Sequence, residues 1–213
     1  MEFVGLLSGK GEKALHYMNK TYGKQFGDSF KLKDMELAGF TSLADNFTMT
    51  SECFPECYIR VTRSKGRYTT NYMPCFYYQK YQEYMQRLIE DVLGDCKVLY
   101  NMYIFPSVVY DYKTTFEEFL HDNRSLKTLK VFVPDINNMD TKIEKILEIL
   151  KEQSIYLGEI TFEILSKYSD AKTFTHINDW CRYEEENYEN INGFVIYSFD
   201  RDHTIRYKKE EHK

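Results

Sequence analysis

Residues 76–93, FYYQKYQEYMQRLIEDVL, followed by Gly94, decide how the rest of this chain is interpreted. Apolar and aromatic residues recur there every three or four positions, which places their side chains on one face of an α-helix. A glycine directly after them suits the left-handed position that ends many helices. We therefore predict a long amphipathic helix that covers a sheet with the face formed by Tyr77, Tyr81, Tyr84, Met85, Leu88 and Val92.

The chain before this helix predicts one further helix and a small antiparallel sheet. Residues 11–22 have apolar side chains at helical spacing, and Gly23 is the expected end of that helix. Alternating or β-rich segments predict strands at residues 29–38, 46–50, 57–63 and 67–72. The last two strands flank Ser64-Lys65-Gly66, which predicts a hairpin in which the glycine supplies a positive φ.

The chain after the long helix predicts a second mixed unit. Residues 96–105 are expected to form a strand that closes the first half, and a short helix is expected after Thr114. The later predicted elements are a strand at 126–133, a helix at 139–151, a strand at 158–165, a helix at 175–188 and a hairpin of 193–199 with 203–207. The strand, helix, strand order predicts a βαβ crossover.

The fold class that follows is α+β, with small antiparallel sheets covered by amphipathic helices in two similar-sized α/β halves packed together. The predicted halves are residues 1–110 (helix, antiparallel strands, long helix, strand) and residues 111–213 (βαβ unit, helix, closing hairpin). A chain of 213 residues can bury roughly 70% of the surface that it exposes when unfolded. It therefore needs no disulfides or bound metals to form a stable core.

Composition excludes some functional classes. The 33 acidic and 28 basic residues are interspersed and give a net charge of −5, so no domain-wide cationic face is available for a phosphate backbone, and we expect no nucleic-acid partner. The 15 Phe and 19 Tyr against only 4 Pro indicate an ordered, aromatic core.

Recognisable reaction motifs are absent from the sequence. The segment Gly5 to Gly11 has the wrong spacing for a phosphate loop, and GxSxG, HExxH and GxGxxG do not occur. Five cysteines without paired CxxC spacing do not predict a zinc site. We therefore assign no catalytic residue, no cofactor and no metal.

His176, Asp179 and Cys181 lie close enough in sequence to raise the hypothesis of a thiol enzyme. Helical geometry favours a different interpretation, because Cys181 shares the apolar stripe of Ile177 and Trp180 while His176 points elsewhere. A buried, inert cysteine is expected at this position.

One local concentration of cations beside aromatic residues surrounds the predicted hairpin. The candidate ligand-binding residues there are Arg60, Arg63, Arg67, Tyr68 and Tyr72, which suit an anionic ligand. A solvated hairpin tip is the simpler alternative.

Cys57 and Cys75 fall nearly opposite each other if that hairpin turns at Lys65-Gly66, a placement compatible with a disulfide. Buried thiols are the alternative.

The first eight residues, MEFVGLLS, are too short to span a bilayer but read like the tail of a longer apolar segment. That interpretation predicts membrane anchoring through a missing N-terminal segment. A frayed N-terminus is the alternative.

Three stretches resemble a group of uncharacterised secreted or lipid-anchored proteins of Gram-positive bacteria. They are residues 14–26 (ALHYMNKTYGKQF), Asn71-Tyr72 before the tyrosine-rich helix, and residues 115–120 (TFEEFL). The resemblance implies an extracytoplasmic location and no known activity.

The leading functional hypothesis is a non-catalytic binding or interaction protein of unknown ligand, either a protein or a small molecule, on the outer face of a Gram-positive membrane. The alternatives are a cytoplasmic immunity-like protein that binds a basic effector through its acidic surface, with Glu184–Glu186 and Glu189 as the motivation, and an enzyme whose site is assembled from distant residues.

Overall fold

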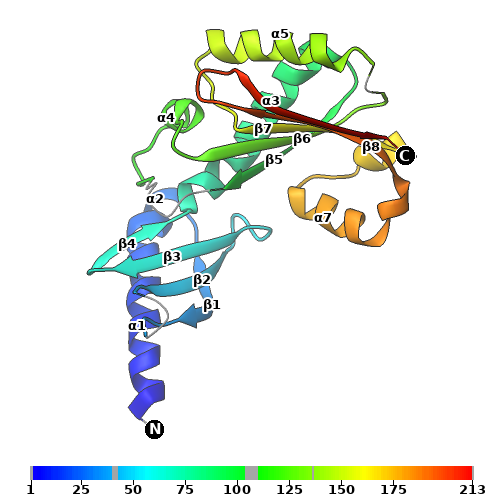
Figure 1. Ribbon diagram of the computed structural model, residues 1–213. Helices are drawn as coiled ribbons and strands as arrows, with labels where there is room; N and C mark the ends of the chain where they lie inside the picture. The colour runs from blue at the N-terminus through cyan, green and yellow to red at the C-terminus, as the bar shows by residue number, and fades with distance from the viewer. Residues whose placement is uncertain (1, 40–42, 104–109, 136, 213) are drawn as a thin grey trace. The chain divides into compact units, whose positions relative to one another are not determined.

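The computed structural model describes residues 2–39, 43–103, 110–135 and 137–212 (Figure 1). The chain forms two compact units, which we call unit 1 (Met1–Tyr77 and Val109–Thr115) and unit 2 (Tyr78–Val108 and Phe116–Lys213). Each unit has its own sheet, with four strands in unit 1 and five in unit 2. The predicted α+β class with two α/β halves is confirmed.

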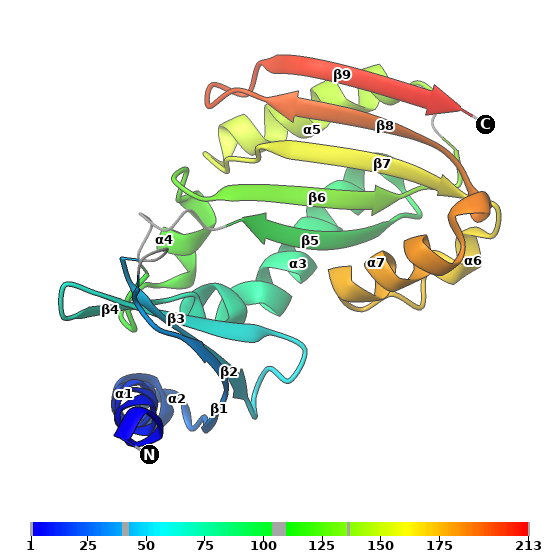
Figure 2. The same ribbon diagram turned by 60° about the horizontal axis from the view of Figure 1, so that its bottom comes forward.

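Unit 1 contains an antiparallel sheet with the strand order β1-β2-β3-β4 (Figure 2). Its strands are β1 (Phe30–Glu36), β2 (Asp45–Ser51), β3 (Tyr58–Ser64) and β4 (Arg67–Thr70). Every second residue of β2 is buried, which is the pattern of a sheet with one covered face. The predicted hairpin is confirmed, and its turn residues Lys65 and Gly66 both have positive φ, 48° and 80°.

The N-terminal helix is longer than the sequence predicts. Helix α1 (Glu2–Met18) continues through a π-helical turn (Asn19–Gly23) into α2 (Lys24–Phe26), and the left-handed residue is Gly27, with a φ of 70°. The expected end at Gly23 is wrong. Gly23 has helical dihedral angles, and a Cβ there would lie 2.8 Å from the Asp28 carbonyl oxygen, so this glycine permits close packing rather than a stop.

Helix α3 (Tyr72–Leu93) confirms the predicted long helix but begins four residues earlier than expected. Residue Tyr72, predicted at the end of a strand, is instead the first residue of the helix. Pro74 lies within the first turn, where its missing N–H has no helical partner to lose. The helix divides between the two units after Tyr77.

Aromatic rings form the core of unit 1 around Tyr72, which is fully buried. The Tyr72 ring centroid lies 4.6 Å from that of Tyr22 and 5.5 Å from that of Phe30. Further rings within 6.3 Å of it belong to Phe26, Phe54 and Phe76. The many Phe and Tyr residues of this unit therefore serve packing between its first helices, its sheet and the start of α3.

Unit 2 contains a mixed sheet with the order β5-β6-β7-β8-β9. Its strands are β5 (Lys97–Tyr103), β6 (Leu126–Phe132), β7 (Glu159–Leu165), β8 (Ile191–Phe199) and β9 (Ile205–His212). Strands β6 and β7 are parallel and joined through α5 (Met139–Glu152), which confirms the predicted βαβ unit, and β8 with β9 confirms the closing hairpin.

One expectation for the sheets is corrected. The strand after the long helix was expected to close the first half, but β5 pairs with β6 along its whole length and so belongs to the sheet of unit 2. The short helix α4 (Phe116–His121) lies between these two strands in sequence. The hydrogen bonds of a seven-residue antiparallel pairing with β6 determine the sheet to which β5 belongs, although β5 is close in sequence to the first four strands.

Helices cover both faces of the unit 2 sheet (Figures 1 and 2). Helices α3 and α5 lie on one face, while α6 (Tyr168–Ala171) and α7 (Ile177–Glu186) cover part of the other. Under α7, Trp180 is 1% exposed and packs on Phe132 with the ring centroids 5.0 Å apart. The rest of this cluster consists of Leu99, Leu165, Ala171, Phe174 and Ile191.

A buried ion pair lies beside this cluster. Lys130 on β6 pairs with Glu163 on β7, and the Lys130 ammonium lies 4.7 Å from the Trp180 ring centroid. The Glu163 side chain is 5% exposed, and its Oε2 atom has no hydrogen-bond partner among the described residues. Burial raises the pKa of the Glu163 carboxyl, and Lys130 partly offsets that rise.

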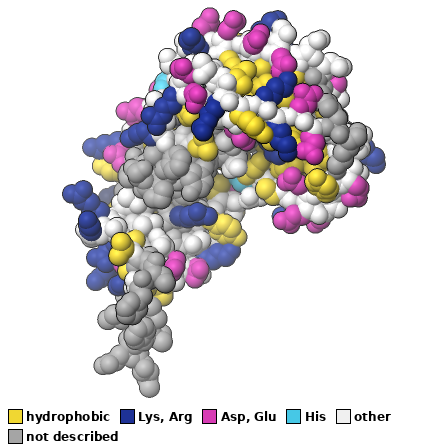
Figure 3. Space-filling model, in the orientation of Figure 1, with side chains coloured by type: hydrophobic (Ala, Val, Ile, Leu, Met, Phe, Trp, Pro, Cys, Tyr) yellow, Lys and Arg dark blue, Asp and Glu magenta, His cyan; other side chains and the backbone are white. Residues whose placement is uncertain are grey.

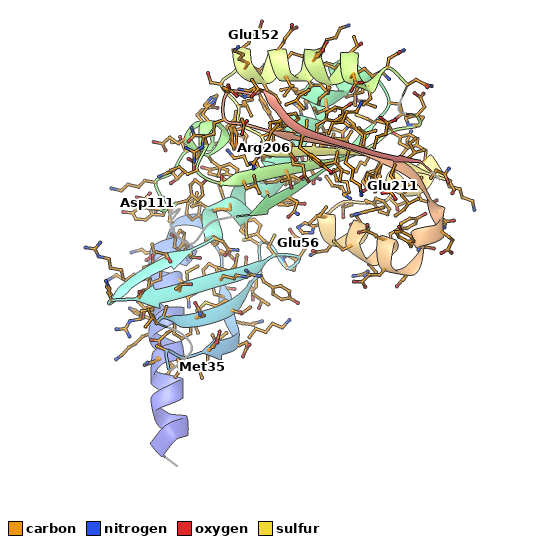
Figure 4. All side chains as sticks on the ribbon, in the orientation of Figure 1. Met35, Glu56, Asp111, Glu152, Arg206 and Glu211 are labelled. Atoms are coloured by element: carbon orange, nitrogen blue, oxygen red, sulfur yellow. The ribbon has the colours of Figure 1, made fainter. Side chains whose placement is uncertain are left out.

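Strand β9 is the edge of the unit 2 sheet and is exposed along its described side chains. It carries two successive lysines followed by two glutamates, with ion pairs between Lys208 and Glu210 and between Lys209 and Glu211. Figure 4 labels Arg206 and Glu211 on this strand. Lys208 also bonds to Asp140 of α5, with its Nζ 2.6 Å from Oδ1, which ties the edge to the helix.

Among the helices of the described ranges, none combines the length and the hydropathy that a membrane crossing requires.

Candidate functional site

An open hollow of about 640 Å³ in unit 1 is a candidate for a ligand site. Its wall is one face of α1 and the π-helical turn, and its remaining contact comes from β4. The lining residues of α1 follow the spacing of a helical face, three or four positions apart. The residues that line the hollow are Gly9, Glu12, Lys13, His16, Tyr17, Lys20 and Tyr68.

Two tyrosines form the aromatic part of this surface. The rings of Tyr17 and Tyr68 are stacked, with centroids 4.6 Å apart and an interplanar angle of 16°. Both side chains are half-buried, so part of each ring remains open to the hollow. Burial raises the pKa of the Tyr17 phenol, and the nearby Asp111, labelled in Figure 4, raises it further. The phenol therefore stays neutral at physiological pH.

Basic side chains line the same hollow as the stacked rings. Lys13 and Lys20 are exposed, and neither forms an ion pair with another residue of the described ranges. His16, on the same helical face, is also exposed. Glu12 supplies one opposing carboxylate. Lys13 and Lys20 therefore make the surface next to the stacked tyrosine rings cationic. Their ammonium groups are exposed and so are available to a ligand.

Two other cations of unit 1 form ion pairs with a buried carboxylate. Asp45 is 4% exposed and accepts hydrogen bonds from Lys10 Nζ at 2.9 Å and from the Ala38 N–H at 3.0 Å. The Arg63 guanidinium lies 3.6 Å from its second oxygen. Burial alone raises the pKa of the Asp45 carboxyl, but these three groups together lower it below its ordinary value. The Lys10 ion pair thus holds α1 to the sheet, whereas the Arg63 ion pair joins β3 to β2 within it.

The sequence-predicted candidate residues do not gather at one place. Arg63 and Tyr68 are directly opposed across β3 and β4, and the Arg63 guanidinium carbon lies 5.8 Å from the Tyr68 ring centroid. Strand alternation puts Arg60 and Arg67 on the opposite face of the sheet from this pair. Tyr72 lies in the core and presents no surface to a ligand.

The cations of the β3–β4 hairpin itself are solvated. Lys65 and Arg67 at its tip are exposed, and Figure 3 shows Lys and Arg side chains in dark blue over this hairpin. Tyr68 and Arg63 face α1, while Arg60 and Arg67 extend into solvent.

The α1 contribution to the hollow was not predicted. A signal for it exists in the sequence, because Lys13, His16, Tyr17 and Lys20 recur at helical spacing opposite the buried Ala14 and Met18. The stack of Tyr17 on Tyr68 joins segments far apart in the chain, and periodicity does not report such a contact.

The thiol-enzyme hypothesis has no geometric support in unit 2. His176 Nδ1 accepts a hydrogen bond from the Asn178 N–H at 3.2 Å, and Asp179 Oδ2 accepts one from the His176 N–H at 2.9 Å, so both residues cap the start of α7. The expected burial of Cys181 is wrong, because this residue is exposed. Partial desolvation and Glu184 raise the pKa of its thiol, which disfavours a reactive thiolate.

Cys57 and Cys75 are both buried, and their side chains are joined by a hydrogen bond. All five cysteines lie in described ranges, and no two of them are joined by a disulfide. No cluster of three or more His, Cys, Asp or Glu side chains in those ranges is arranged to hold a metal ion.

Comparisons with known proteins add little. No protein-family model and no curated protein matches the sequence. Among solved structures, a similar chain is found in the crystal structure of a DUF5037 family protein from Ruminococcus gnavus ATCC 29149. The two sequences are 10% identical, the TM-score is 0.44, and the match covers 91% of this chain and 93% of the other. A likeness this distant transfers no function.

Proposed function

We propose that this protein is a non-catalytic binding protein and that its ligand carries an anionic group beside a flat or apolar face. The observation that carries the proposal is the hollow of unit 1, which is lined by the stacked rings of Tyr17 and Tyr68 together with Lys13 and Lys20. An aromatic surface with a few convergent polar groups is the usual composition of a ligand site.

The chemistry of these side chains defines a ligand class. Lysine ammonium groups bind phosphate or carboxylate as point charges, without the planar geometry that arginine imposes. The open parts of two tyrosine rings offer flat apolar area with little conformational entropy to lose. A phosphorylated or carboxylated saccharide satisfies both requirements, and the openness of the hollow suits one unit of a polymer.

The expected site of action is outside the cytoplasm of a Gram-positive bacterium. The resemblance of residues 14–26, 71–72 and 115–120 to secreted or lipid-anchored proteins supports this proposal. Fractionation of cells that express the complete gene should place the protein in the membrane or wall fraction, where added protease degrades it. Recovery in the protected cytoplasmic fraction would contradict the proposal.

Reversal of the two lysine charges in the hollow should weaken binding of an anionic polymer. For the double variant Lys13→Glu and Lys20→Glu, we expect affinity for poly(glycerol phosphate) or polyglucuronate to fall at least tenfold, about 1.4 kcal/mol or more, because attraction becomes repulsion. Isothermal titration calorimetry at low salt measures the change, with neutral dextran as the uncharged comparison.

The matched control changes the same net charge elsewhere. Lys145 and Lys151 are exposed on α5 of unit 2, so Lys145→Glu with Lys151→Glu should alter affinity less than twofold. An equal loss in both double variants would assign the effect to net charge rather than to the hollow. Failure of the wild-type protein to bind either anionic polymer more tightly than dextran would reject the proposed ligand class.

A second candidate function has one observation in its favour. The end of α7 and the turn after it carry exposed Glu185, Glu186 and Glu189, and Tyr188 is 62% exposed beside them. This acidic surface suits a basic protein partner, as for an immunity-like protein. Capture of a basic neighbouring gene product by the wild type, and its loss in the variant Glu185→Lys with Glu186→Lys, would favour this function.

A further inference from the structure

The start of β3 is fastened to the first turn of α3 by one asparagine. The Asn71 side chain accepts a hydrogen bond from the Arg60 N–H at 2.7 Å and donates one to the Tyr58 carbonyl at 3.1 Å. The Asn71 backbone adds an N–H bond to the Arg60 carbonyl at 3.3 Å, and its own carbonyl accepts the Cys75 N–H at 3.2 Å. These hydrogen bonds therefore fix the backbone next to Cys57 and at Cys75.

The loop before β3 is held against the same helical turn by its aromatic residue. The Phe54 ring lies 5.8 Å from the Tyr72 ring and 6.1 Å from the Phe76 ring, centroid to centroid. The Phe54 carbonyl also accepts the Cys57 N–H at 3.0 Å, which closes a turn onto Cys57. Backbone on both sides of Cys57 is thus positioned relative to α3 by contacts that do not involve the cysteine side chains.

The two thiols meet at this junction. Cys57 and Cys75 are each 9% exposed, and a hydrogen bond joins their side chains. Two buried thiols that share a hydrogen bond, on backbone segments held by the contacts of Asn71 and Phe54, are placed as candidates for a disulfide. The other three cysteines are placed differently: Cys96 is buried in unit 2 beside Gln86, while Cys53 and Cys181 are exposed.

We propose that Cys57 and Cys75 are a dithiol that closes into a disulfide by exchange with an external disulfide, which clamps the entrance of β3 to the first turn of α3. One protein thiolate attacks a sulfur of the external disulfide and releases one external thiol. The second protein thiolate then attacks the mixed disulfide and releases the other. Two protein S–H bonds are lost, one S–S bond forms, and the external disulfide is reduced to two thiols.

The surroundings of the pair set the conditions for this reaction. The hydrogen bond to Cys57, together with burial, raises the pKa of the Cys75 thiol well above its ordinary value, so the attacking thiolate is scarce at neutral pH. Closure should therefore be slow at pH 7 and faster at pH 8.5. Neither cysteine is among the residues that line the hollow, so the proposal does not depend on the binding function.

The test counts thiols and maps the bridge. The full-length protein is incubated with excess oxidised glutathione at pH 8.5, denatured, alkylated and analysed by intact mass and peptide mapping. We expect thiols to fall from five to three apart from glutathione adducts at the exposed Cys53 and Cys181, with a cross-linked peptide that joins residues 57 and 75. The bridge should also raise Tm by several degrees over the reduced protein.

Variants separate this bridge from its competitors. Cys53→Ala should leave the 57–75 cross-link intact, whereas Cys57→Ser and Cys75→Ser should each abolish it together with the redox-dependent shift in Tm. The serine substitutions change one atom of each side chain, and circular dichroism of the reduced variants checks that they fold. Retention of free thiols at residues 57 and 75 after oxidation, or a bridge that uses Cys53 instead, would overturn the proposal.

Discussion

Replacement of Tyr72 by alanine is expected to destabilise unit 1 by about 3–5 kcal/mol, the cost typical of removing a large buried ring from a packed core. The side chain is fully buried and contacts the aromatic rings that join the first helices, the sheet and α3. Tyr72→Phe keeps the ring and should change stability by about 1 kcal/mol or less.

The fluorescence of the single tryptophan distinguishes unfolding of unit 2 from unfolding of unit 1. Trp180 is the only tryptophan in the chain and lies in unit 2, so its fluorescence follows that unit, while far-UV circular dichroism follows both. Urea unfolding of the Tyr72→Ala protein should show an early loss of part of the dichroism. If Tyr72→Ala unfolds at the same urea concentration as wild type by both probes, the ring cluster is not the core of unit 1.

Replacement of Lys130 by methionine is expected to cost about 3 kcal/mol at pH 8. Methionine keeps most of the packing against Trp180 but removes the charge that pairs with Glu163, whose side chain is 5% exposed. A buried carboxylate left without its partner is strongly destabilising. Trp180 lies 4.7 Å from the Lys130 ammonium, so its fluorescence reports unfolding at the site of the change.

The loss should shrink as pH falls. Burial raises the pKa of Glu163 above its unfolded value, and removal of Lys130 takes away the group that opposes this rise. A carboxyl with a raised folded pKa contributes stability below its unfolded pKa and loses that contribution as pH rises through the folded pKa. The difference between Lys130→Met and wild type should therefore be smaller at pH 5 than at pH 8.

A double variant controls for lost packing. Lys130→Met with Glu163→Leu replaces the whole pair by apolar side chains, which is often neutral or stabilising, and should recover most of the stability at pH 8. A double variant as unstable as Lys130→Met at both pH values would show that the lost term is packing of the lysine stem rather than an unpaired carboxylate.

The elements with strong periodicity were predictable from sequence. The helices around residues 72–93 and 139–152 and both hairpins carry clear patterns, and the parallel pairing of β6 with β7 follows from the strand, helix, strand order. The end of the first helix was not predictable from Gly23, because a glycine that permits close packing and a glycine that stops a helix are the same residue in a sequence. The partner of β5 depended on tertiary pairing that no local pattern contains.

The candidate site was only partly predictable for the same reason. Composition around the hairpin identified Arg63 and Tyr68, which do face α1, but it included Tyr72, whose ring is in the core. Strand alternation alone could have separated Arg60 and Arg67 from Arg63. The contact of Tyr17 with Tyr68 required knowledge of which helix covers the sheet.

The charged outer strand of unit 2 limits how this protein associates with other copies of itself. A foreign strand that approached β9 to continue the sheet would bring its own backbone against a row of lysine and glutamate side chains, which must lose water and existing ion pairs before any new backbone bond forms. At high concentration the molecule is therefore protected from fibril-like stacking along this border, and neutralisation of Lys208 to Glu211 would remove that protection.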